Sequence, residues 1–191
     1  METRRNGAMS TKNLVMYALL TAIVVVLQII AEFAPKVGPC SLSFVLVPVV
    51  VGAALCGNKA GAWLGFVFSV VVLLCPSTSV FYGISFIGTI IVVLVKGTLS
   101  GLFAGIVYKL FEKVNMYLAV LLAAVTAPVV NTGIFLLGCR IFFFEAIKSW
   151  AGGQNVVTYM FLGLAGFNFL FELVSNILLS PAILRIIKVR K

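Results

Sequence analysis

Six apolar runs, separated by short polar breaks, constrain the fold of this chain more than any other feature. A helix needs about 20 mostly apolar residues to cross the hydrocarbon core of a bilayer, where every backbone polar group must be satisfied within the protein. The sequence therefore predicts an all-α integral membrane protein, with residues 1–191 in one membrane domain and a short segment 1–12 ahead of six transmembrane helices. The second and third runs are the shortest, so a tilted or partly re-entrant pair is the alternative to two ordinary spans. The helices are expected at about 13–31, 42–56, 60–74, 84–108, 117–139 and 159–187.

The composition favours helices in a membrane over the other classes of fold. The chain is 62% hydrophobic and 10% charged, whereas soluble domains contain about 45 to 50% apolar and about 25% charged residues. A transmembrane β-barrel requires strands in which apolar and polar residues alternate. Stretches such as 99–107 and 118–125 show no such alternation, so they fit helices and not barrel strands.

The residue types that common membrane enzymes need are scarce in this sequence. The chain contains no histidine, which excludes metalloproteases, rhomboid-type serine proteases and haem-binding bundles that use imidazole as a base or ligand. An enzyme acting on lipid head groups needs a carboxylate cluster or a metal motif, but the five acidic residues are spread from Glu2 to Glu172. We therefore expect no enzymatic activity, no metal and no cofactor.

The cysteines give no sign of metal or redox chemistry. They lie far apart and form no CxxC pair, which is the spacing that marks metal knuckles and redox motifs. We expect them to be buried thiols at Cys40, Cys56, Cys75 and Cys139.

The distribution of basic residues predicts the orientation of the helices. Cytoplasmic loops of membrane proteins carry an excess of lysine and arginine. With the N-terminus in the cytoplasm, 10 of the 14 basic residues fall inside, Lys36, Arg140 and Lys148 fall outside, and Lys96 lies within a helix. Both termini are therefore expected to be cytoplasmic, and this orientation explains the net charge of +9 without a nucleic-acid partner. The longer breaks then face outward, at about 32–41, 75–83 and 140–158.

Small residues recur at every fourth position in three of the expected helices. Residues four apart share one helix face, so each set forms a groove that another helix can approach closely. We expect the glycine grooves to pack helices within the chain rather than to bind a partner. The small residues are Gly57, Gly61 and Gly65 in the third run, Gly97, Gly101 and Gly105 in the fourth, and Ala18 and Ala22 in the first.

Polar side chains within the expected spans are the strongest candidates for function, because they are costly to place in hydrocarbon. Three of them are four residues apart in the sixth run and form one polar stripe. At about 1.5 Å per residue, Lys96, Asn131 and Asn168 lie at a similar depth, roughly 12 Å from the outer surface, and Glu172 lies deeper. The sequence therefore predicts one outward-facing pocket formed by Lys96, Asn131, Thr132, Asn168, Glu172 and Asn176.

Three features have two interpretations each. Lys96 either forms a structural ion pair with Glu172 or holds a carboxylate or other anion of a bound solute. Pro128, three residues before Asn131, predicts either a simple kink or irregular helix geometry. The aromatic residues of the last outward break form either an interfacial belt, which we favour, or a stacking platform; they are Phe142, Phe143, Phe144, Trp150 and Tyr159.

Several stretches together resemble one family of membrane transporters. They are residues 18–22, 38–48, 51–68 and 96–109, with Asn131 and Thr132 further along the chain. On these residues, their order and the six-helix topology, the chain resembles the substrate-binding S components of energy-coupling-factor (ECF) vitamin transporters. The third run and residues 101–109 look most similar to pantothenate-type members. Riboflavin and folate members share much of the same frame, so these vitamins stay as alternatives.

The resemblance implies a function, partners and a location. An S component captures a vitamin from outside, topples in the membrane and releases the vitamin inside. Ala18 and Ala22 match the surface that packs on the transmembrane coupling subunit, and two separate ATPase subunits supply the energy. This chain has no GxxxxGK[ST] phosphate-binding loop. Its absence agrees with ATP hydrolysis by separate subunits. The location implied is the plasma membrane of a prokaryote, and the carboxylate of pantothenate would give Lys96 a partner.

A carrier of another class is the main alternative. A stand-alone proton-coupled permease would use Glu172 as the group that titrates during the transport cycle, because acidic residues within membranes mark proton relays.

Overall fold

The computed structural model contains only helices and turns over the residues that it describes, 11–33 and 44–190. The predicted all-α class is therefore confirmed for this part of the chain. Most of segment 1–12 lies outside the described residues, as do Lys36 and Cys40. The helices are α1 (Thr11–Phe33), α2 (Leu46–Cys56), α3 (Asn58–Leu74), α4 (Ser79–Tyr82), α5 (Phe86–Phe111), α6 (Met116–Phe142), α7 (Phe144–Trp150), α8 (Val156–Thr158) and α9 (Phe167–Arg190), with a 3₁₀ turn η1 (Pro76–Thr78) and a π-helix η2 (Tyr159–Gly166).

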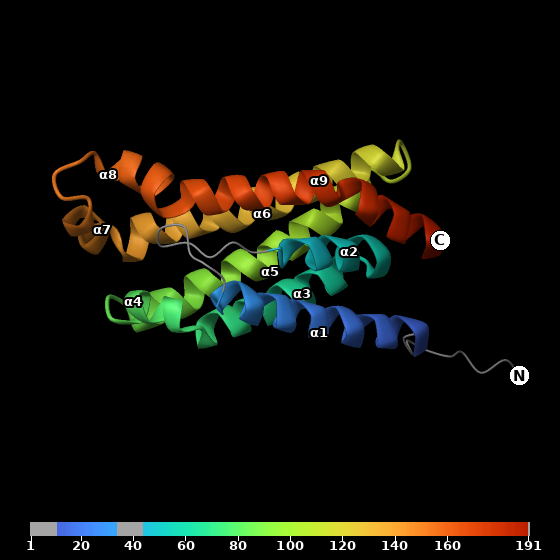
Figure 1. Ribbon diagram of the computed structural model, residues 1–191, viewed down its shortest axis with the longest axis horizontal. Coiled ribbons are helices and arrows are strands. Elements are labelled where there is room, and N and C mark those ends of the chain that lie inside the picture. Colours follow the sequence, from blue (N-terminus) through green and yellow to red (C-terminus); the bar gives the residue numbers. More distant parts are fainter. Residues whose placement is uncertain (1–10, 34–43, 191) are drawn as a thin grey trace, which may run out of the picture.

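The long helices lie side by side along one axis of the molecule (Figure 1). Helix α5 packs most extensively against α3 and α6, and α6 also packs against α9. The short helix α2 contacts α1, α3, α5, α6 and α9, so it lies at the centre of the bundle. Its 11 residues rise about 16 Å, which is only half of the roughly 30 Å hydrocarbon core.

The number of full spans among the described residues is smaller than the predicted six. Helices α1, α5 and α6, and the continuous stretch from α8 to α9, are each long and apolar enough to cross a membrane. Helix α3 and the segment Pro76–Tyr82 meet at a bend of 74° and together make one broken span. The described residues thus contain four candidate spans, or five with the broken one, and α2 is too short to be another.

The breaks 75–83 and 140–158, which were expected to be outward-facing loops, contain short helices. The first holds η1 and α4, and the second holds α7 and α8. Apolar side chains explain the difference in the second break, because Phe143 and Ile147 are buried in a cluster with Cys139, Met160 and Leu164. Burial of such side chains stabilises a compact segment, which polarity alone does not predict.

The glycine grooves pack α3 against α5, which confirms the expected intramolecular role. A methyl group at Gly61 would overlap the carbonyl oxygen of Gly101, and one at Gly65 would overlap that of Gly97. The two backbones therefore touch at both levels. Gly57 lies outside this seam: its φ of 90° makes the tight turn between α2 and α3, in a region that glycine adopts without strain.

Large apolar side chains cover much of the outside of the bundle as well as its core. On α1 the exposed face carries Leu19, Ile23 and Val26 together with Ala18 and Ala22. A lipid environment accommodates such a surface, whereas water does not. The two alanines are therefore accessible to a partner within the membrane, and their role at an interface stays a prediction.

The ends of the bundle separate the two predicted sets of loops. Figure 1 shows the start of α1, the α2–α3 turn, the α5–α6 turn and the end of α9 at one end, and α4, α7 and α8 at the other. The segments expected inside and those expected outside thus lie at opposite ends of the molecule.

The cysteines are placed largely as expected. Cys75 and Cys139 are buried, whereas Cys56 is half-buried at the end of α2. The structure thus bears out the predicted burial for two of the three described cysteines.

Candidate functional site

A cavity of about 160 Å³ lies in the half of the bundle that carries α4, α7 and α8. A single water needs only about 10 to 15 Å³, so the cavity has room for a small solute. Its 18 lining residues come from α1, α3, η1, α4, α5, α6, η2 and α9, with Phe143 just after α6: Gln28, Phe68, Val72, Ser77, Thr78, Phe81, Thr89, Val92, Val93, Lys96, Asn131, Thr132, Phe135, Phe143, Leu164, Ala165, Asn168 and Glu172.

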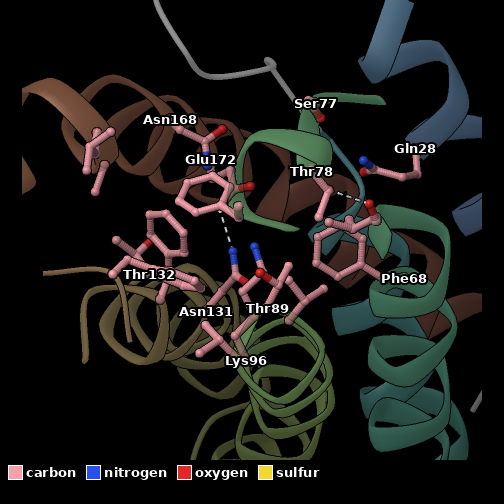
Figure 2. A pocket seen from close by; sticks show the side chains of 18 residues that line it. Gln28, Phe68, Ser77, Thr78, Thr89, Lys96, Asn131, Thr132, Asn168 and Glu172 are labelled. Carbon is pink, nitrogen blue, oxygen red and sulfur yellow. Dashed lines mark hydrogen bonds between the residues drawn. The ribbon is translucent and has the colours of Figure 1, made fainter. Parts of the chain in front are cut away.

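Five of the six predicted pocket residues line this one cavity (Figure 2). Lys96 comes from α5, Asn131 and Thr132 from α6, and Asn168 and Glu172 from α9. Helices α5, α6 and α9 thus bring these few polar side chains together inside an otherwise apolar bundle.

The sixth predicted residue, Asn176, lies outside the cavity lining. It is buried one turn further along α9, and its Nδ2 donates a hydrogen bond of 2.8 Å to the backbone oxygen of Glu172. The four-residue spacing does place it on the stripe, but this contact lies within its own helix.

Asn131 and Glu172 form the polar centre of the cavity. Asn131 Nδ2 donates to Glu172 Oε2 at 3.4 Å, and the two side chains are 3% and 2% exposed. In this contact the amide nitrogen donates and the carboxyl oxygen accepts. The Oδ1 atom of Asn131 then points elsewhere, and no described residue donates to it.

Lys96 approaches the cavity along an aromatic wall. Its Nζ lies 5.3 Å from the centroid of the Phe135 ring, a contact that stabilises a cation by about 0.5 to 2 kcal/mol. Phe81 packs against Phe135 and Phe143 with ring centroids 5.8 and 5.2 Å apart. The cavity therefore combines one ammonium group, amides and a carboxylate with flat apolar surfaces.

The aromatic residues of the last break, 140–158, and Tyr159 beside it differ in exposure. Phe143 is 2% exposed and lines the cavity, whereas Phe142 and Trp150 are exposed. Phe143 therefore belongs to the cavity wall, and the interfacial belt stays a prediction for the exposed residues.

Irregular helix geometry occurs at η2 and not in α6, where Pro128 had suggested it. Helix α6 runs as a continuous α-helix through Pro128 and Asn131. The wide π-helical turns occur instead at η2, where Leu164 and Ala165 line the cavity just before Asn168. Such turns are rare and often occur at functional sites. Gly163 and Gly166 within η2 were the available sequence signal.

The sequence analysis missed three buried polar residues of the cavity. They are Gln28 on α1, Thr78 in η1 and Thr89 on α5. Both threonines donate to backbone oxygens, Thr78 to Val72 and Thr89 to Ser85. Only Gln28 was detectable as a polar residue within a long apolar run, which is the criterion that identified the other candidates.

These features define a class of protein: a helical, multi-pass membrane protein with a buried polar cavity for a small molecule. Few polar groups set among apolar walls are typical of sites that bind solutes. No group of histidine, cysteine or acidic residues that would hold a metal ion occurs within 11–33 and 44–190.

The family follows from comparison with known proteins. Residues 12–187 match the model of the family described as ECF transporter, substrate-specific component. This match covers most of the chain, so the protein belongs to that family. It is a substrate-binding transporter subunit that works with an ECF module of transmembrane and ATPase subunits. A search of curated proteins finds no match to this chain.

Proposed function

We propose that this subunit captures a water-soluble vitamin that carries a carboxylate, with pantothenate favoured, for uptake across a prokaryotic plasma membrane. The observation that carries the proposal is the meeting of Lys96, Asn131, Asn168 and Glu172 in one cavity. Polar groups are retained at such depth when they bind one another or a solute.

The charges of the cavity support an anionic solute. Lys96 supplies a compact positive charge with three donors, and a carboxylate accepts hydrogen bonds from such a group more strongly than a neutral oxygen does. Asn131 and Asn168 add amide groups beside it. A structural ion pair between Lys96 and Glu172 is the competing role for the lysine.

The size of the cavity supports a compact vitamin. Its volume of about 160 Å³ is small beside the roughly 300 to 1,000 Å³ of typical ligand pockets. Pantothenate is short and unbranched apart from two methyl groups, whereas riboflavin and folate carry fused rings. The aliphatic part of pantothenate would contact Phe68, Phe81 and Phe135.

The arrangement of the helices supports entry from outside. We place both termini in the cytoplasm, with α4, α7 and α8 at the outer face, because most basic residues then lie inside. The cavity lies at that outer end, where a vitamin arrives. In this proposal α2 completes a set of six membrane-embedded segments without crossing the bilayer alone.

Retention of a vitamin by the purified protein tests the proposal. The chain is purified in detergent and its bound small molecules are identified by mass spectrometry, followed by titration with pantothenate, riboflavin, folate, thiamine and biotin. We expect pantothenate to bind most tightly. Binding of another vitamin alone would contradict the preference for pantothenate, and binding of none would contradict vitamin capture.

A further inference from the structure

Gln28 is a buried amide in the cavity wall on a helix to which no solute contact has been assigned. It lies on α1 five residues before the helix ends, is 4% exposed and lines the cavity. Its Nε2 faces Cys75 Sγ at 3.9 Å, a long and weak contact. No described residue donates a hydrogen bond to its Oε1.

A buried acceptor without a donor needs an explanation, because such atoms are few in folded proteins. The neighbouring hydroxyl groups do not serve it, since Thr78 donates to Val72 and Thr89 donates to Ser85. The rest of the run around Gln28 is apolar, and an apolar side chain here would leave no polar atom unsatisfied. The amide therefore suits a cavity in which a solute supplies the missing donor.

The position of Gln28 indicates which end of the solute it meets. Figure 2 shows Gln28 and Lys96 on different sides of the cavity, with Gln28 extending from α1 beside Thr78. The charged groups Lys96 and Glu172 come from α5 and α9. The cavity-lining residues on the Gln28 side are neutral, and the carboxylate of Glu32, one turn further along α1, is bound to Ser77. A solute held by its anionic group at Lys96 therefore presents its uncharged end to Gln28.

We propose that Gln28 recognises a hydroxyl group of the solute at the end remote from Lys96, which makes the substrate a hydroxy acid. A hydroxyl group both donates and accepts, so it satisfies a side-chain amide in either orientation. The amide oxygen of Gln28 is covered in this arrangement, and rotation of the terminal amide turns it toward the cavity that Gln28 lines. This inference rests on the proposed capture of a carboxylate vitamin.

Two probes and a matched pair of variants test this role. The probes are pantothenate and its analogue in which both hydroxyl groups are replaced by hydrogen. Gln28→Met removes the amide at nearly constant length, and Gln154→Met makes the same change at an exposed position. We expect Gln28→Met to weaken pantothenate binding about fivefold to tenfold and to leave the analogue unchanged, as loss of one neutral hydrogen bond predicts. Gln154→Met is expected to change neither affinity.

The outcomes separate this inference from the function on which it rests. Equal weakening of both probes by Gln28→Met, or no weakening, overturns the role of Gln28 while vitamin capture stands. Failure of the wild-type chain to bind pantothenate overturns both. If Gln28→Met does not fold, Gln28→Glu is used in its place, because it keeps acceptor oxygens at this position. This variant is expected to bind pantothenate more tightly than the analogue without hydroxyl groups. Equal affinities of the variant for the two probes would overturn the inference.

Discussion

Asn131 on α6 and Glu172 on α9 are joined across the cavity by a hydrogen bond of 3.4 Å from Nδ2 to Oε2. Both side chains are almost completely buried by the surrounding protein. The contact links the two helices that carry most of the predicted site. It therefore bears on the stability of the bundle and on the shape of the cavity.

Replacing Asn131 by leucine is expected to lower the free energy of unfolding by about 1 to 3 kcal/mol, because Glu172 loses a buried donor. Combining Asn131→Leu with Glu172→Gln is expected to cost less than the sum of the single changes, since a neutral amide needs that donor less than a carboxylate does. Thermal unfolding in detergent measures all three variants. Strictly additive losses would show that the two side chains do not interact.

The helices were predictable because their signal is long and local. The runs expected at 84–108 and 117–139 correspond to α5 and α6, each slightly longer in the structure. Hydropathy did not reveal that α2 is a short central helix or that 140–158 contains α7 and α8. Those features depend on burial against residues that are distant in the sequence, as at Ile147. Such burial cannot be predicted from the local sequence alone.

Replacing Lys96 by methionine is expected to weaken binding of pantothenate roughly tenfold to a hundredfold, because a charged hydrogen bond to its carboxylate is lost. Binding of the uncharged amide of pantothenate is expected to change little. Lys148→Met, at an exposed position on α7, is the control. Calorimetric titration of both ligands measures the effect, and equal losses for the two would favour a structural ion pair with Glu172.

Replacing Gly65 by alanine is expected to destabilise the protein by about 1 to 3 kcal/mol, because the added methyl group overlaps the backbone of Gly97. Gly133→Ala on α6 is the matched control, since no atom lies within 4 Å of a methyl group there. The control should be neutral or slightly stabilising, as alanine favours helices. Melting temperatures in detergent compare the two. Similar melting temperatures for the two variants would contradict the prediction, because they would mean that α3 and α5 accommodate the added methyl group without loss of stability.

Replacing Ala18 or Ala22 by tryptophan is expected to abolish ATP-driven uptake while vitamin binding by the purified subunit stays unchanged. A bulky side chain on this exposed face of α1 would prevent close packing of the coupling subunit. Leu178→Trp, which changes an exposed residue of α9, is expected to leave uptake intact. Uptake of labelled pantothenate in cells that contain the whole transporter measures this. Normal uptake by both alanine variants would exclude this face as the interface.

The site was partly predictable because buried charge is rare in hydrocarbon. Lys96 and Glu172 stood out on that ground alone, and the stripe spacing added Asn168. Thr78 and Thr89 were not detectable, since threonines that bond to their own backbone are common in helices and turns. Asn176 is the opposite case: the spacing places it on the stripe, but it lies outside the cavity lining, and its role stays a prediction.

Glu32 at the end of α1 binds Ser77 in η1 twice, with its carboxylate oxygens 3.0 Å from the backbone nitrogen and 2.7 Å from the hydroxyl of Ser77. Ser77 also lines the cavity, so this link holds one wall in place. Ser77→Ala removes one of these contacts and Glu32→Ala removes both. We therefore expect the dissociation rate of the vitamin to rise in Ser77→Ala and to rise further in Glu32→Ala, by roughly tenfold in the latter. Ser79→Ala, at an exposed position, is the control. Dissociation rates of labelled pantothenate measure the series, and equal rates would show that the wall does not limit release.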